Sequence, residues 1–161
     1  MPLTAPELSL SVQYCTPAAA LPRWRLRNWL SRALRYLSAR FELDMARVEI
    51  NLRIVDADEG RLLNRQFRQK DYATNVLTFE YGTDPTGTLR SDIVLCHPVL
   101  VSEAKTQGKA LEHHAAHLVL HGLLHALGYD HLDDEQAAEM ETLEIELLAR
   151  MRIPNPYLAE H

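Results

Sequence analysis

Residues 111–131 read LEHHAAHLVLHGLLHALGYDH, and this stretch has the largest influence on the fold. From Leu111 to Leu127 nearly every position that is not histidine is leucine, valine or alanine. A helix that is apolar almost all round is a core helix, and its one polar stripe is expected to face a cavity. At 100° per residue the stripe consists of His114, His117, His121 and His125.

Two of these histidines have the spacing of metal ligands. His121 and His125 lie four residues apart, so on a helix they share one face and can bind one ion. Gly128 can take the left-handed conformation that ends the helix, and the chain can then bring round His131 as a third ligand. Three histidines leave a position for water, which is typical of a catalytic zinc site.

A second ligand set has to be weighed against this one. His117 and His125 are about 12 Å apart along a helix axis, too far for both to bind one ion. The alternatives are therefore His121 and His125 with His131, or His117 and His121 with an unidentified group. The expected turn at Gly128 favours the first set. A histidine-rich buried helix whose rings are only hydrogen-bonded is the alternative to any metal site.

The histidine pattern lacks one residue of a metallopeptidase. Zincins carry their general-base glutamate directly after the first histidine, and this chain has Gly122 there. The metal ligands of a peptidase are thus predicted without the peptidase's base. His114 and His117 are expected either to line the cleft and support the ligands or to be hydrogen-bonded core histidines.

Composition predicts one globular domain over residues 1–161. With 161 residues, 47% hydrophobic and 24% charged, the chain can bury a sizeable core. Its start lacks the pattern of a signal peptide, and no stretch approaches the length of a membrane span. Cys15 and Cys96 show no metal-type spacing. We expect a cytoplasmic protein with no membrane partner.

The net charge of −5 is unevenly distributed, because residues 1–112 sum to +2 and residues 113–161 to −7. Basic patches in the first part can attract phosphates although the whole protein is acidic. The alternative is that the first basic group is only the solvated side of a helix. The first group is Arg23, Arg25, Arg27, Arg32, Arg35 and Arg40, and the second is Arg61, Arg65, Arg68 and Lys70.

Local patterns place the strands early and the helices late. Alternating or β-rich runs predict strands over residues 8–14, 48–55, 76–81 and 92–96. Helices are expected after Pro22, after a cap at Asp56 or Asp58, and over residues 100–106, 111–127 and 134–151. This order favours the α+β class, as a sheet of about four strands packed by helices.

Residues 63–79 combine the end of a short helix, a basic loop and a strand entered through Thr74 and Asn75. Together with the histidine pattern and the run from Ser91 to Cys96, this segment resembles the YbeY family of bacterial metal-dependent endoribonucleases. The resemblance covers roughly residues 48–158, and Gly122 is the family's own residue at its position. Tyr72, Ala73 and Thr78 depart mildly from the usual pattern.

The resemblance implies a single small domain with a mixed, mostly parallel sheet and a Zn²⁺ ion at His121, His125 and His131. It implies that activity needs Arg68. It further implies a role in ribosomal RNA processing, namely small-subunit 3′-end maturation, and in ribosome quality control. The expected partners are ribosomal RNA and the ribosome or ribosomal proteins, with no small-molecule cofactor.

The expected chemistry is hydrolysis of a phosphodiester. A zinc-bound water or hydroxide would attack the phosphate while Arg68 stabilises its charge. Asp130 can orient a ligand ring, while Asp92 and His97 are candidates for proton transfer or simply belong to element ends. A zincin-like metallopeptidase or other metallohydrolase, and a ribosome-assembly factor with a mainly structural metal, remain as alternatives. Imidazoles also accept nickel, iron or copper.

Overall fold

The strands of the sheet lie in the spatial order β1-β2-β4-β3. The computed structural model describes residues 5–130 and 132–158. Strands β1 (Glu7–Tyr14), β2 (Arg47–Val55) and β4 (Thr88–Cys96) are parallel to one another. Strand β3 (Val76–Thr83) pairs antiparallel with β4 and forms one edge. The predicted mixed, mostly parallel sheet of four strands is confirmed.

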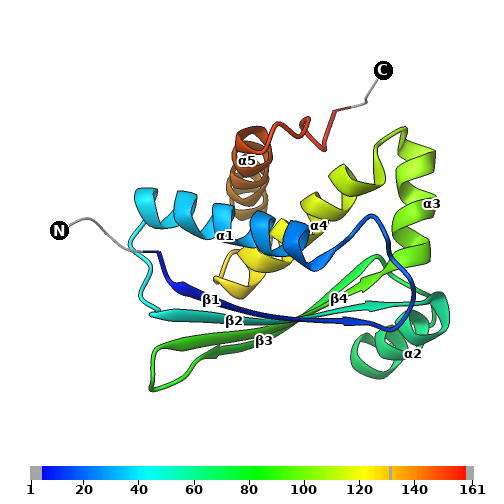
Figure 1. The fold of residues 1–161 in the computed structure, drawn as a ribbon, viewed down its shortest axis with the longest axis horizontal. Helices are drawn as coiled ribbons and strands as arrows, with labels where there is room; N and C mark the ends of the chain where they lie inside the picture. The colour runs from blue at the N-terminus through cyan, green and yellow to red at the C-terminus, as the bar shows by residue number, and fades with distance from the viewer. Residues whose placement is uncertain (1–4, 131, 159–161) are drawn as a thin grey trace.

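Helices cover the two faces of this sheet unequally (Figure 1). Helices α1 (Arg23–Arg40) and α4 (Leu111–Ala126) lie on one face, and α5 (Asp134–Arg150) packs on α4 from outside. The main core fills this side. On the other face α2 (Ala57–Arg68) covers only the end where the parallel strands finish. A second, smaller hydrophobic cluster fills the space between α2 and the sheet. The α+β class is therefore confirmed.

Side-chain caps start two of the helices. Asp56 caps α2, because its carboxylate accepts a 2.9 Å hydrogen bond from the backbone N–H of Glu59. This settles the choice between Asp56 and Asp58. Asp133 caps α5 in the same way through the N–H of Gln136 at 2.8 Å.

Gly128 ends helix α4 as its position predicts. Its φ of +102° is in the range that favours glycine, and a Cβ at this residue would meet no heavy atom within 4 Å beyond its chain neighbours. The N–H of Tyr129 donates back to the carbonyl of Leu124 at 3.0 Å, as in a Schellman cap. The chain therefore leaves α4 at the end that carries His125.

Two elements begin three or four residues before their predicted starts. Strand β4 begins at Thr88 rather than at Asp92, because pairing with β2 and β3 on both sides extends it through residues with weak local strand signals. Helix α3 (His97–Gln107) begins before the predicted residue 100. Pro98 lies in its first turn, where the missing N–H needs no partner.

Candidate active site

Helix α4 brings the imidazoles of His121 and His125 together at one end of a cleft. Their Nε2 atoms lie 3.2 Å apart and their ring centroids 4.6 Å apart. Two nitrogens that each bind a tetrahedral zinc at about 2.0–2.1 Å would be separated by about 3.3 Å. The chemistry and spacing of these two donors thus fit a zinc ion.

The predicted third ligand, His131, lies outside the described residues. Within residues 5–130 and 132–158 no three His, Cys, Asp or Glu side chains form a group that could hold a metal ion. The three-histidine set therefore stays a prediction. Asp130, next to it in the chain, lines the same cleft as His121 and His125.

A buried carboxylate on α5 holds the histidine stripe in place. Glu144 is 1% exposed, and its Oε1 accepts a 2.9 Å hydrogen bond from Nδ1 of His121. Its Oε2 lies 2.5 Å from Nε2 of His117 and accepts from the hydroxyl of Tyr157 at 2.7 Å. Since Nδ1 of His121 carries the proton of this bond, its Nε2 keeps a lone pair that can bind a metal.

Electrostatics keep this carboxylate ionised. Burial by itself would raise the pKa of Glu144, but hydrogen bonds from His117, His121 and Tyr157 outweigh it and lower the pKa to about 2. We did not predict Glu144 from the sequence. The signal was present, because a lone glutamate occupies the apolar face of α5 between Leu143 and Leu147.

The other two histidines of the stripe are hydrogen-bonded to carboxylates. His117 contacts Glu144, as above, and its ring centroid lies 6.3 Å from that of His121. His114 is buried, and its Nε2 lies 2.9 Å from Oε1 of Glu103. The same Glu103 oxygen accepts from Nδ2 of Asn75 at 3.0 Å, and Asn75 lines the cleft. Both histidines thus support the cleft walls.

We call the space in front of His121 and His125 the histidine cleft. It encloses about 560 Å³ between α4, β3 and the end of α2. The structure places Arg68 in this cleft, together with the two histidines, although some fifty residues separate them in the chain. Asp92 and His97, the candidates for proton transfer, do not line it.

The end of helix α2 positions Arg68. Gln69 takes a left-handed conformation, with φ of +59°, and its N–H bonds to the carbonyl of Arg65, which ends the helix. The buried side chain of Asn64 donates to the carbonyl of Tyr72 at 2.8 Å and fixes the following loop. The last helical side chain, Arg68, is thereby held at the cleft.

Arg68 differs from its neighbour Arg61 in its contacts. Arg61 makes a bidentate ion pair with Asp71, with N–O distances of 2.7 and 2.9 Å. The described part of the chain offers no such partner to Arg68. Of the second basic group, Arg68 is thus the member that lines the cleft with its guanidinium available to a ligand.

The first basic group on α1 is largely used to hold the fold. Arg23 donates to the carbonyl of Val12, and Arg32 donates to that of Arg150. Arg25 bonds to the carbonyl of Ala20 and pairs with Glu112, and Arg40 pairs with Glu146. Because these arginines already have partners within the protein, the first basic group is better interpreted as the solvated side of a helix than as a phosphate-binding patch.

Gly122 lets α4 approach the sheet. A Cβ there would lie 3.0 Å from Cδ1 of Ile93 and 3.2 Å from Oγ1 of Thr78. A glutamate at the zincin position would have to displace both side chains.

None of the helices in residues 5–130 and 132–158 has the length and apolar character that a membrane span requires.

Comparison with known proteins agrees with the predicted resemblance. The family described as endoribonuclease YbeY matches residues 14–152. A protein of Bordetella pertussis with that name is 58% identical over 155 residues, covering 96% of this chain and 99% of the relative. One from Thiobacillus denitrificans, also so named, is 49% identical over 154 residues, covering 95% and 98%.

A solved structure supports the fold. The solution structure of a Thermotoga maritima protein superposes with a TM-score of 0.58 at 24% identity, covering 89% of this chain and 91% of that one. At this identity the likeness shows the fold alone. The family match and the two relatives cover nearly the whole sequence, so the chain belongs to the endoribonuclease YbeY family.

Proposed function

We propose that this protein is a metal-dependent endoribonuclease that cuts single-stranded segments of ribosomal RNA in the histidine cleft. The observation that carries the proposal is the meeting of the two Nε2 atoms, 3.2 Å apart, with Arg68 in one cleft. Membership of the endoribonuclease YbeY family supports the reaction type. The sequence resemblance supports action in the cytoplasm, on the ribosome or with ribosomal proteins, in small-subunit 3′-end maturation and quality control.

His121, His125 and His131 would hold the metal, for which zinc is the first candidate. When bound, the ion supplies Lewis-acid charge to the phosphate and lowers the pKa of water. Glu144 contributes by keeping the proton of His121 on Nδ1, so that Nε2 retains the lone pair that would bind the ion. No carboxylate at position 122 is needed for this chemistry.

Arg68 supplies the second requirement of phosphodiester cleavage. Its planar guanidinium can donate two parallel hydrogen bonds to the non-bridging oxygens of a phosphate. Charge grows on these oxygens as the bond breaks, so the contact is strongest in the transition state. Glu80 and Asp130 line the cleft as well, and burial followed by the charge of Asp130 raises the pKa of Glu80. Oε1 of Glu80 lies 3.8 Å from Nδ1 of His125, so a cation bound beside the histidines would favour the charged form of Glu80.

The experiment compares purified wild type, Arg68→Ala and His125→Ala on structured ribosomal RNA and on casein. Loss of one transition-state hydrogen-bond donor typically lowers the rate about 10²- to 10³-fold, and we expect such a loss for Arg68→Ala. Arg61→Ala is the matched control, because Arg61 is paired with Asp71 and does not line the cleft.

Unchanged RNA cleavage in both cleft variants would contradict the proposal, since a contaminating nuclease would then explain the activity. Casein cleavage that His121→Ala abolishes would favour a metallopeptidase instead. A structural metal would be favoured if cells show ribosome-maturation defects only with those metal-site variants that fail to fold.

A further inference from the structure

A second pocket lies on the open face of the sheet, beside α2. It encloses about 550 Å³, and we call it the sheet pocket. Leu63, Phe67, Phe79 and Val94 form its apolar side. Its polar side is formed by groups that donate or accept hydrogen bonds, among them Gln13, Asn51, Tyr81 and Asp92.

The sheet pocket adjoins the histidine cleft. Phe67 and Phe79 line both spaces, and their rings meet edge to face with centroids 5.1 Å apart. Strand β3 is the edge of the sheet, and its side chains alternate between the two sides. Thr78 contacts α4 at the histidine side, whereas Tyr81 lines the sheet pocket. A polymer in the cleft therefore reaches the pocket by passing around one strand.

Aromatic rings in the sheet pocket are open to a flat ligand. Tyr81 and Phe67 are each 62% exposed, which is unusual for rings of this size. Bases of single-stranded RNA stack on such rings, and stacking tolerates any base because each has a π-face.

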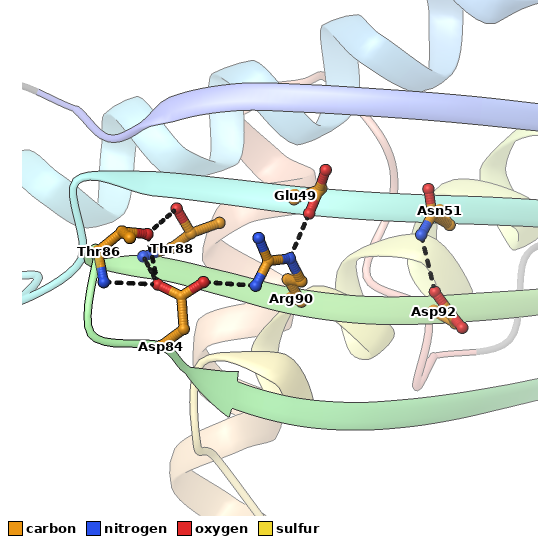
Figure 2. Close-up of polar contacts among 7 residues, drawn as sticks. All are labelled: Glu49, Asn51, Asp84, Thr86, Thr88, Arg90 and Asp92. Carbon is orange, nitrogen blue, oxygen red and sulfur yellow. Dashed lines mark hydrogen bonds and ion pairs between the residues drawn. The ribbon is translucent and has the colours of Figure 1, made fainter.

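The polar groups of the pocket suit a base better than a phosphate. Asp92 accepts from Nδ2 of Asn51 at 3.1 Å and from the hydroxyl of Tyr81 at 2.9 Å, each on a different oxygen (Figure 2 shows the Asn51 bond). Each carboxylate oxygen keeps a further lone pair for an N–H donor. Arg53, the lining arginine, is already paired with Glu59. The carboxylate of Asp92 repels a phosphate, and Arg53 does not offset this because its charge is already balanced by Glu59. The same carboxylate can accept hydrogen bonds from a base.

We propose that the sheet pocket binds one unstacked nucleobase of the single-stranded RNA that is cut in the histidine cleft. The inference rests on the proposed function for the identity of the polymer. Continuity through Phe67 and Phe79 places the base close to the cleaved bond. The pocket holds the RNA in register, and the histidine cleft carries out the chemistry.

The test is a scan with single abasic positions. An RNA oligonucleotide that the full-length, metal-loaded enzyme cleaves is made with one abasic residue at each position flanking the cut in turn. Single-turnover cleavage gives the half-saturating enzyme concentration and the maximal rate. We expect one position at which loss of the base raises the half-saturating concentration on the order of tenfold, with little change in maximal rate.

Tyr81→Ala identifies the pocket in this scan. On intact RNA it should raise the half-saturating concentration to a similar degree, and the abasic residue at the sensitive position should then add nothing further. Tyr81→Phe keeps the ring and should restore most of the affinity, which separates stacking from a folding defect. Trp24→Ala is the matched control, because Trp24 is 65% exposed on α1 and lines neither space.

A flat scan, or full additivity of Tyr81→Ala with the abasic residue, would overturn the sheet pocket while leaving the histidine cleft intact. The open face would then be left for contact with a protein. A sensitive position that depends on Tyr81, together with unchanged cleavage by Arg68→Ala and His125→Ala, would support the pocket and overturn the proposed cleavage site.

Discussion

The two faces of strand β4 are approached by helices in the same way but are used differently. On one face Gly122 brings α4 close to Ile93, and on the other Gly60 brings α2 close to Cys96. A Cβ at Gly60 would lie 2.9 Å from Sγ of Cys96. Helices α1, α4 and α5 complete the first side, whereas α2 covers only one end of the second (Figure 1).

This difference decides which charged contacts matter. On the covered side Glu144 is buried and its partners His117 and His121 are only partly exposed, so loss of a partner would leave hydrogen-bonding groups with little access to water. On the open side Arg90 joins Glu49 and Asp84 in contacts that face solvent (Figure 2). Exposed pairs of that kind contribute little to stability. Similar hydrogen bonds thus have unequal weight because water competes much less for the buried carboxylate of Glu144 than for the exposed groups around Arg90.

The largest effect is expected from Gly122→Glu on the covered side. The added Cβ would already press on Ile93 and Thr78, and a charged side chain would start from a buried position, so we expect the free energy of unfolding to fall by more than about 3 kcal/mol. Chemical denaturation measures it. Val101→Glu places the same residue at an exposed position of α3 and should change stability little. A stable Gly122→Glu protein that cleaves casein would refute this account of the glycine.

The next effect concerns Glu144→Ala, which leaves His117 and His121 without their acceptor. Each hydrogen bond to a charged group typically contributes about 1.5–3 kcal/mol to stability, and loss of the support of a metal ligand weakens metal binding by about 10- to 100-fold. Denaturation and zinc titration measure the two effects. Glu146→Ala is the matched control two residues along α5, because Glu146 pairs with Arg40 at the surface. Equal behaviour of both variants would contradict the role of burial.

A smaller effect is expected from Gly60→Ala on the other side of β4. The added methyl group meets Sγ of Cys96, and overpacking of this kind costs about 1–3 kcal/mol. Cys96→Ala removes the sulfur, so the double variant should regain part of that stability. Denaturation of both single variants and the double variant tests the coupling. Strict additivity would show that α2 adjusts without contact to Cys96.

The smallest effect concerns Asp84 in the exposed turn between β3 and β4. Hydrogen bonds from the side chain of Thr86 first, then the N–H of Thr88, lower its pKa from 3.8 to about 2, although partial burial opposes this (Figure 2). A pKa lowered by folding favours the folded state above pH 3.8, and this contribution is lost as the pH falls toward 2. An NMR titration of the carboxyl group should show the low pKa, and Thr86→Val should raise it. An ordinary pKa in the wild type would contradict the turn geometry.

Many elements could be predicted because their signals are local. Strands β1 and β2 and helices α4 and α5 begin or end within a residue or two of the expected positions. The predicted boundary of β4 was wrong because its first residues are strand only by virtue of pairing on both sides. Glu144 was missed, although it interrupts the apolar face of α5, because only the packing of α5 on α4 shows which groups it contacts.

Local features follow from the sequence alone: histidines four residues apart on an apolar helix, and a glycine in a left-handed conformation that ends it. The structure confirms the glycine with a φ of +102°. Backbone geometry over a few residues dictates such features. The tertiary structure was needed to show that Arg68 lines the cleft, that Glu144 supports His121, and that one face of the sheet stays open. These depend on strand order and on which helix packs where, because contacts between distant segments are set by burial of the whole core.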